Sequence, residues 1–199
     1  DIAFTYLTQQ QAAMATVAEI EALGVRVKAY ASDAASYEQS HAIVEQVKAD
    51  FGRIDVLVNN AGISQQALFT DITDEMWQKM IGVNLTGAFN CTRRALPYMI
   101  NKKQGKVINI ASMWGEVGAS MEVHYSVTKA GLIGFTKALA KEFIEAFTAE
   151  RDTADVWEEE ASGKIRLITA IYSNPKRIYR LDTNGSLCTV YEQVIYKEE

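Results

Sequence analysis

The amino-acid sequence predicts an α/β domain built on a parallel β-sheet. Through residues 1–143, short apolar runs alternate with longer amphipathic stretches. The apolar runs are rich in β-branched residues, as expected for strands that are covered on both faces. The amphipathic stretches end at glycines or begin after hydroxyl residues, as helices do. This alternation indicates parallel strands that are joined by right-handed helical crossovers.

The first part of the chain contains three expected strands and two expected helices. Strands are expected at 2–6, 25–31 and 54–58, with helices at 9–23 and 34–51. Gly24 and Gly52 follow the two helices directly, at the position where a left-handed residue commonly ends a helix. The third strand (IDVLV) is dense in β-branched residues, which indicates burial on both faces.

The next part continues the same pattern. A helix is expected over 74–81 after Thr73, followed by a longer helix over 86–103. The run KVINIA at 106–111 predicts another buried strand. Residues 124–147 predict a helix whose apolar side is formed by Ala130, Leu132, Ile133, Phe135, Leu139 and Phe143.

The pattern changes after residue 143, so we expect three parts: 1–143, 144–163 and 164–199. The middle part is rich in acids, which is typical of a solvated helix or linker. Residues 164–172 predict a strand. Two further alternating runs flank Asn184-Gly185, and Asn-Gly between strands is a strong hairpin signal. The last part is therefore expected to be an antiparallel β unit.

Composition excludes several classes of protein. The net charge of −5 argues against sequence-independent nucleic-acid binding and against anionic membranes. The apolar runs are too short to span a bilayer, and the first residues do not resemble a signal peptide. Cys91 and Cys188 lie far apart without a Cys/His cluster, so neither a disulfide scaffold nor a metal site is expected. A reduced, cytoplasmic protein fits these features.

Tyr125 and Lys129 are the first candidate catalytic pair. On a helix, residues four apart share a face, so phenol and ammonium can approach each other. A nearby ammonium lowers the pKa of a tyrosine, which suits a general acid for a ketone oxygen. The Tyr-x-x-x-Lys pattern is weak alone, because it also occurs at Tyr98 and at Tyr172. Most isolated pairs of this kind are surface contacts.

Ser112 distinguishes the Tyr125 copy from the other two. It lies at the end of the strand at 106–111, and ligands of open α/β sheets bind at the carboxyl ends of strands. Asn59-Asn60-Ala61-Gly62 follows another strand with small residues that permit close approach of a ligand. Asn84 lies within a helical stretch, where asparagine is unfavourable. An ordinary turn and a helix kink are the plainer interpretations of these last two features.

Together these motifs resemble the short-chain dehydrogenase/reductase family, especially its β-ketoacyl-acyl-carrier-protein reductase branch. The resemblance spans residues 1–142, and its motifs stand in the family's order: Asp33, NNAG at 59–62, Asn84 in VNLTG, INIAS ending at Ser112, YSVTK at 125–129 and KAGLIGFTKALAKE at 129–142. It implies a Rossmann-like, doubly wound parallel sheet that hosts nicotinamide-dependent ketone reduction.

The resemblance also implies roles for individual residues. Tyr125 would donate the proton, and Lys129 would assist that transfer while it holds the nicotinamide ribose. Ser112 would orient the substrate carbonyl, and Asn84 would fix a water in the proton relay. The remaining expected cofactor contacts are Asp33 at the adenine and Asn60, Ala61 and Gly62 along the dinucleotide. The nicotinamide would supply the hydride.

One family element has no counterpart in this sequence, namely the first strand with its glycine-rich turn and helix. That strand would lie between the strands at 2–6 and 54–58, so the predicted sheet lacks its first βα unit. Without it, two strand edges keep unpaired N–H and C=O groups. We expect 164–172 to follow the catalytic helix as the next strand; the alternative places this segment in the vacant central position.

The cofactor is expected to be NADP(H) rather than NAD(H). NAD-selective sites carry an acid at the end of the corresponding strand, and Phe4-Thr5-Tyr6-Leu7-Thr8 has none. The resemblance also implies a homo-oligomer and an acidic acyl carrier protein as partner. The carrier would contact a basic stretch that contains Arg93, Arg94, Lys102 and Lys103. A solvated helix end that complements the helix dipole explains this stretch equally well.

Two further hypotheses remain open from the sequence. The chain could be a non-catalytic scaffold or interaction protein, truncated or rearranged, that binds no dinucleotide. Alternatively, the natural protein could contain upstream residues that supply the glycine-rich unit.

Overall fold

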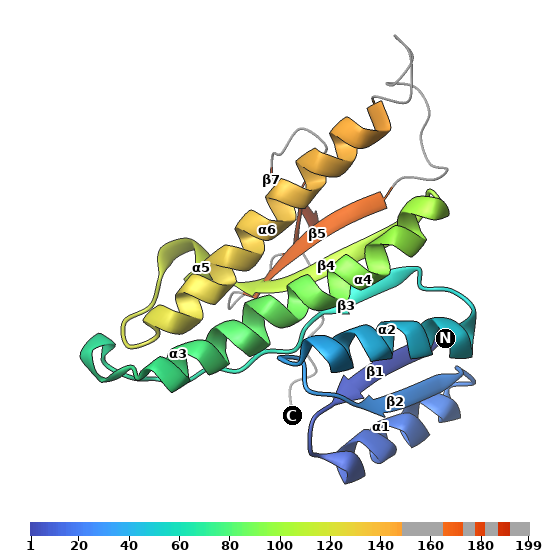
Figure 1. Cartoon of the computed structure of the whole chain (residues 1–199), viewed down its shortest axis with the longest axis horizontal. Helices are drawn as coiled ribbons and strands as arrows, with labels where there is room; N and C mark the ends of the chain where they lie inside the picture. The colour runs from blue at the N-terminus through green and yellow to red at the C-terminus, as the bar shows by residue number, and fades with distance from the viewer. Residues whose placement is uncertain (149–164, 173–177, 182–186, 192–199) are drawn as a thin grey trace.

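The computed structural model describes residues 1–148, 165–172, 178–181 and 187–191. Strands and helices alternate through most of the chain (Figure 1). The strands are β1 Ile2–Tyr6, β2 Val27–Ala31, β3 Val56–Asn59, β4 Gly105–Ser112, β5 Ile165–Tyr172, β6 Ile178–Leu181 and β7 Leu187–Tyr191. The helices are α1 Gln10–Ala22, α2 Tyr37–Phe51, α3 Asp74–Ile81, α4 Gly87–Asn101, α5 Trp114–Val117 and α6 Val123–Thr148, with a short 3₁₀ turn η1 Phe69–Asp71.

The parallel strands form two groups. β1 pairs with β2 from Ile2 opposite Val27, and β3, β4 and β5 form a second parallel sheet in that order. This confirms the predicted α/β class with parallel strands. β5 pairs with β4 along its whole length, so the expected placement of 164–172 holds and the alternative central placement is wrong.

The strand boundaries differ from the sequence prediction by one or two residues. β2 and β3 begin two residues later than expected, and β4 extends to Ser112. Residues 178–181 and 187–191 pair antiparallel as β6 and β7. The Asn184-Gly185 turn and most of the acidic segment lie outside the described residues.

The helices expected at 74–81 and 86–103 are confirmed as α3 and α4, within two residues at their ends. They are joined by a π-helical turn, η2, over Gly82–Thr86, which was not predicted. A π turn adds a residue to the helical repeat, and such turns are frequent at functional sites. The helix is therefore widened at η2, and Asn84 is the central residue of this π turn.

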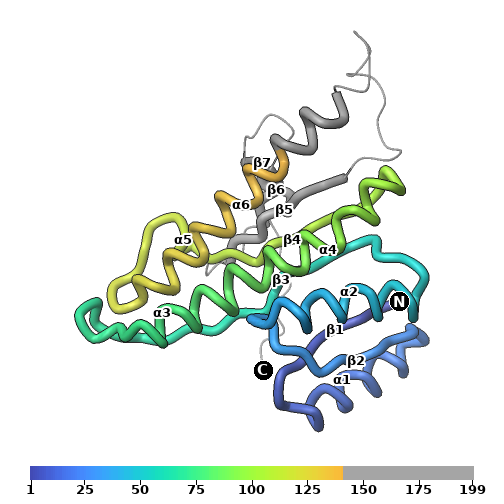
Figure 2. The backbone as a smooth tube through the Cα atoms, in the orientation of Figure 1, coloured from blue at the N-terminus to red at the C-terminus, as the bar shows by residue number. Residues whose placement is uncertain are grey.

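Helices α4 and α6 pack against the second sheet, and α2 packs against α4 (Figure 2). Two apolar clusters form the core, one under α2 and α4 around Met99 and Val107, and one under α6 around Ala111 and Leu132. Burial of these apolar side chains is the main favourable contribution to folding.

A buried chain of polar side chains connects β3 to β4 and to the helices above them. Asn59 Nδ2 donates to Thr92 Oγ1 at 2.9 Å and to Asn109 Oδ1 at 2.7 Å. Asn109 Nδ2 donates to Thr136 Oγ1 at 2.8 Å. Asn109 and Thr136 are fully buried, and buried amides keep their stability only when they are paired. The network therefore fixes β3, β4, α4 and α6 relative to one another.

Candidate active site

Lys129 lies at the centre of the candidate site. It is 4% exposed, and its Nζ donates to the carbonyl oxygen of Ile110 on β4 at 2.8 Å. Burial lowers the pKa of the Lys129 ammonium. An ammonium has three N–H donors, and among the described residues Ile110 is the single acceptor at Nζ. Donors therefore remain for a bound ligand.

Tyr125 lies beside this ammonium. One turn of α6 separates the two residues, and Lys129 Nζ is 5.6 Å from the centre of the Tyr125 ring. Tyr125 is partly exposed, whereas Ser126 and Thr128 on the same turn are buried. The phenol and the ammonium thus lie near each other on one face of α6, and the role of Tyr125 as proton donor stays a prediction.

Asn84 holds the loop that follows β3. Its Nδ2 donates to the carbonyl oxygen of Ile63, and its Oδ1 accepts from the Ile63 N–H, both at 2.8 Å. Nδ2 also lies 3.2 Å from Thr128 Oγ1 on α6. The amide thus joins η2, the loop and α6. Its role in holding a water stays a prediction; in the structure it is a positioning residue.

Gly62 brings the loop against both side chains. A Cβ atom placed on Gly62 would lie 3.5 Å from Asn84 Oδ1 and 3.6 Å from Lys129 Nζ. Any larger side chain would fill the space beside the ammonium. Asn60 and Ala61 precede it at the carboxyl end of β3. The structure therefore brings the NNAG loop, Asn84 and Lys129 together.

Ser112 ends β4 and is 6% exposed. It comes two residues after Ile110, whose carbonyl holds Lys129, and its Oγ accepts from the Trp114 N–H at 3.3 Å. Short helix α5 then packs on α6 so closely that a Cβ on Gly115 would lie 2.6 Å from the Lys129 carbonyl carbon. Ser112, Tyr125 and Lys129 are thus carried by adjoining elements.

Asp33 lies in the turn between β2 and α2. Its Oδ1 accepts from the Ala35 N–H at 2.9 Å, and its backbone N–H donates to Gln39 Oε1 at 2.7 Å. The carboxylate thus shapes the turn before α2, and its adenine contact stays a prediction.

The Tyr98 copy of the Tyr-x-x-x-Lys pattern has different surroundings from Tyr125. The hydroxyl of Tyr98 and Nε of Arg94 both donate to Glu45 on α2. These hydrogen bonds hold the pKa of the Glu45 carboxyl below its ordinary value, and the hydrogen bond from Tyr98 is the larger cause. Tyr172 ends β5, and Lys176 lies outside the described residues.

The four basic residues expected to contact a carrier protein differ in their surroundings. Arg94 pairs with Glu45 within the chain, while Arg93 lies over the Phe89 ring. Lys102 and Lys103 are exposed at the end of α4. Contact with a carrier stays a prediction for all four residues.

Several functional contacts were not predicted from the sequence, namely Ile110 as the acceptor for Lys129, Ile63 and Thr128 as partners of Asn84, and the close packing of Gly115. Backbone acceptors carry no side-chain signal, so the first two could not be found. The glycine at 115 was visible in the sequence, but its packing partner depends on the tertiary fold.

The site fits one end of a nicotinamide dinucleotide better than the other. Lys129 retains donors for ribose hydroxyls, and Gly62 leaves space beside them. Pyrophosphate is usually held by a glycine-rich turn at a helix N-terminus. Among the described residues no such turn lies between β1 and β3, where it would adjoin this site. The described residues therefore suit the nicotinamide ribose, and none of them forms a glycine-rich pyrophosphate turn.

Comparison with known proteins identifies the family. The family model of short chain dehydrogenases matches residues 2–146. The chain belongs to the short-chain dehydrogenase family. A crystal structure described as a short-chain alcohol dehydrogenase from Sinorhizobium meliloti superposes with a TM-score of 0.71 at 30% identity, covering 84% of this chain and 59% of that one.

This short-chain dehydrogenase is also similar to 3-oxoacyl-[acyl-carrier-protein] reductases. The enzyme of Staphylococcus aureus is 39% identical over 142 residues, which cover 71% of this chain and 58% of the relative. The Thermotoga maritima enzyme is 43% identical over 126 residues, covering 63% and 51%. The Synechocystis enzyme is 41% identical over 141 residues, covering 71% and 57%. The chain thus spans less than two thirds of these relatives.

The described ranges contain neither a membrane-spanning helix nor a cluster of metal-binding side chains. No helix there is sufficiently long and apolar to cross a bilayer. Nor do three or more His, Cys, Asp or Glu side chains of that part gather as a metal site would require.

Proposed function

We propose that this short-chain dehydrogenase is an NADP(H)-dependent oxidoreductase that reduces a ketone, such as a 3-oxoacyl thioester, to the hydroxy compound. The observation that carries the proposal is the buried Lys129 ammonium beside the Tyr125 phenol, with donors left for a ligand. The names of the similar reductases support the substrate class.

Each residue has a defined task in this proposal. Tyr125 gives its hydroxyl proton to the ketone oxygen, and Ser112 hydrogen-bonds to that oxygen and orients it. Lys129 binds the ribose and stabilises the phenolate that remains on Tyr125, because opposite charges attract strongly in a buried site. Asn84 keeps the loop at 60–63 against the ammonium.

The nicotinamide, when bound, supplies the hydride. Lys129, Tyr125, Asn60, Ala61 and Gly62 would hold its ribose end. The preference for NADP(H) rests on Phe4-Thr5-Tyr6, where an acid that would bind a ribose 2′-hydroxyl is missing from the end of β1. Asp33 is the residue proposed to contact the adenine.

The proposed setting is cytoplasmic fatty acid biosynthesis, with the substrate carried on an acidic acyl carrier protein. Arg93, Lys102 and Lys103 are the exposed members of the proposed carrier surface, and Arg94 is partly buried on α4. We also propose that the protein forms a homo-oligomer.

Oxidation of NADPH by a 3-oxoacyl thioester tests the proposed activity. Wild-type protein should consume NADPH only when the thioester is present. Tyr125→Phe removes the proton donor and should reduce kcat by about 10²–10⁴-fold. Tyr37→Phe, on the exposed start of α2, is the control and should retain wild-type activity. Equal rates for the two variants would refute the role of Tyr125.

A non-catalytic scaffold is the second candidate function. It is favoured by one observation, namely that no described strand pairs between β1 and β3. Titration of the protein with NADPH, followed by nicotinamide fluorescence, separates the candidates. Saturable binding that Lys129→Met weakens supports the oxidoreductase, whereas no binding supports the scaffold.

A further inference from the structure

Thr128 lies between the two proposed catalytic residues of α6, and it is fully buried. Its hydroxyl has partners in two different elements. Oγ1 donates to the carbonyl oxygen of Tyr125 at 2.7 Å, and it lies 3.2 Å from Asn84 Nδ2 on η2. A hydroxyl has a single proton. Because the Tyr125 carbonyl can only accept, it takes this proton, and the Asn84 amide is the donor in the second contact.

The orientation of the Asn84 amide agrees with this assignment. Its Oδ1 accepts from the Ile63 N–H at 2.8 Å, so the position of Nδ2 is fixed. Nδ2 has two protons and three neighbouring acceptors, namely Ile63 O at 2.8 Å, Met80 Sδ at 3.1 Å and Thr128 Oγ1 at 3.2 Å. A thioether sulfur is a weak acceptor. The carbonyl and the hydroxyl are therefore the main acceptors of the two protons.

These hydrogen bonds form a continuous series from the loop after β3 to the proposed proton donor. The series runs from Ile63 through Asn84 and Thr128 to the Tyr125 carbonyl. The same loop lies beside the ammonium of Lys129, as the contacts of Gly62 show. The Thr128 hydroxyl thus ties the turn of α6 that carries both proposed catalytic residues to η2 and to this loop.

Thr136 has the same kind of contacts further along α6. Its Oγ1 donates to the carbonyl oxygen of Leu132 at 2.8 Å and accepts from Asn109 Nδ2 at 2.8 Å. It is also fully buried. Both threonines therefore join α6 to an asparagine of a neighbouring element. They differ in the carbonyl that receives the hydroxyl proton, since only that of Thr128 belongs to a proposed catalytic residue.

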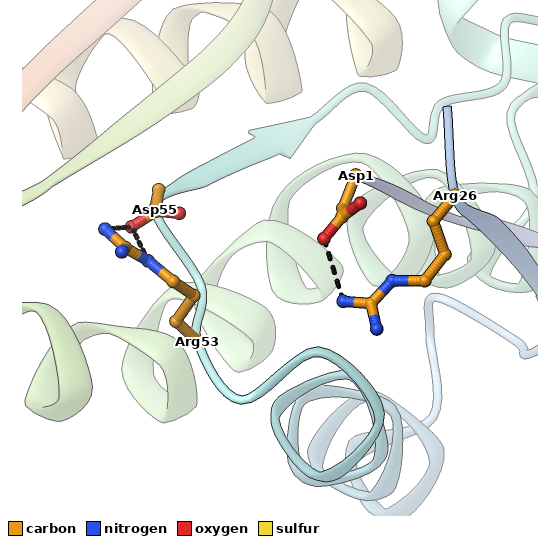
Figure 3. A network of polar contacts seen from close by, with 4 residues as sticks. All are labelled: Asp1, Arg26, Arg53 and Asp55. Carbon is orange, nitrogen blue, oxygen red and sulfur yellow. Dashed lines mark hydrogen bonds and ion pairs between the residues drawn. The ribbon is translucent and has the colours of Figure 1, made fainter. Parts of the chain in front are cut away.

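Ion pairs near the amino ends of β1, β2 and β3 are contacts of a different kind. Arg26 pairs with Asp1 at 2.8 Å and Arg53 pairs with Asp55 at 2.6 Å, and all four side chains are about half exposed (Figure 3). Water screens exposed pairs, so they restrain their surroundings weakly. The Thr128 hydroxyl is shielded from water and cannot exchange its partners for solvent. Its contacts can therefore fix the position of a backbone carbonyl.

We propose that Thr128 is a positioning residue for proton transfer from Tyr125, because its hydroxyl holds the turn of α6 at which the phenol and the Lys129 ammonium reach one ligand. This inference rests on the proposed oxidoreductase function. Valine has nearly the shape of threonine but neither donates nor accepts a hydrogen bond. Its introduction would release the Tyr125 carbonyl and the Asn84 amide from each other. Reacting groups must be aligned closely, so a small displacement of the phenol lowers the rate of the chemical step.

Three variants separate positioning from stability. In NADPH oxidation by a 3-oxoacyl thioester, Thr128→Val should lower kcat about tenfold or more and leave KM within about twofold, because no substrate contact is removed. Thr128→Ser keeps the hydroxyl and should restore most of the rate. Thr136→Val is the matched control. It should lose a similar amount of stability in urea and retain wild-type kcat. Far-UV circular dichroism verifies the folding of each variant.

The outcomes distinguish this inference from the proposed function. If the wild type oxidises NADPH but Thr128→Val keeps its kcat, or loses no more than Thr136→Val does, Thr128 is structural only and the inference is wrong. An inactive wild type would overturn the proposed function and this inference with it. Thr128→Cys covers the case in which Thr128→Val does not fold. A thiol is a weak donor and acceptor, so kcat should be lower than for Thr128→Ser, and equal values would overturn the inference.

Discussion

Lys129 on α6 and Ile110 on β4 are joined by a hydrogen bond of 2.8 Å from Nζ to the carbonyl oxygen. The bond fixes the start of α6 above the carboxyl end of β4, two residues before Ser112. Because Lys129 is almost fully buried, this acceptor offsets part of the cost of removing the ammonium from water. The same bond therefore supports the fold and aligns the proposed catalytic residues.

Replacing Lys129 tests the function of the ammonium. Lys129→Met keeps the length of the side chain but removes the charge, so we expect kcat for ketone reduction to fall by about 10²–10⁴-fold. Lys137→Met, on an exposed position of the same helix, should leave the rate unchanged. Steady-state kinetics of both variants provide the measurement. Similar losses in both would show that the effect belongs to α6 in general.

Replacing Asn84 tests its role in positioning the loop. Asn84→Ala leaves both the N–H and the carbonyl of the partly buried Ile63 without their partner, which costs about 1 kcal/mol for each lost hydrogen bond. We expect the free energy of unfolding in urea to fall accordingly. Asn101→Ala, at an exposed position of α4, serves as the matched control. A stability loss no greater than that of the control would contradict the role of Asn84.

Two glycines should respond in opposite directions to alanine. A Cβ on Gly115 would lie 2.6 Å from the Lys129 carbonyl carbon, so Gly115→Ala must push α5 from α6 and should cost about 1–3 kcal/mol. Gly134 has no atom within 4 Å of that position, so Gly134→Ala should stabilise α6 by about 0.5–1 kcal/mol. Thermal unfolding of both variants measures the difference. If Gly115→Ala unfolds at the wild-type temperature, the described packing of α5 is incorrect.

Tyr30 should make the stability fall at high pH. Burial, followed by the hydrogen bond of 2.8 Å to Asp50, raises the pKa of the Tyr30 phenol. A raised pKa in the folded state means that the unfolded chain loses this proton first, so the contribution is complete below about pH 10 and declines above it. Tyr30→Phe should be less stable at neutral pH and lack this part of the alkaline decline. Urea unfolding at several pH values measures both slopes, and parallel slopes would contradict the assignment.

The sequence predicted the elements that depend on local patterns. Asn84 was recognised because asparagine is unfavourable within a helix, and YSVTK because tyrosine and lysine four apart share a helical face. The π turn itself, the short helix α5 and the buried pairing of Asn59 with Asn109 were not predicted. These features arise from contacts between elements far apart in the chain, to which hydrophobic periodicity is insensitive.

The cleft between β1 and β3 was partly foreseen. The comparison of motifs indicated a vacant position between the strands at 2–6 and 54–58, and the structure places a cleft there. Its floor on α2 and α4 could not be predicted, since helix periodicity shows which face is apolar but not which helices share a surface.

A double-mutant cycle of Ser112→Ala and Tyr125→Phe tests the central claim most directly. If both hydroxyls act on one ketone oxygen, either single change should lower kcat/KM for 3-oxoacyl thioester reduction greatly, and the double change should cost little more than one of them. Losses that simply multiply, or that remain within about twofold of wild type, would show that these two groups do not share a substrate oxygen.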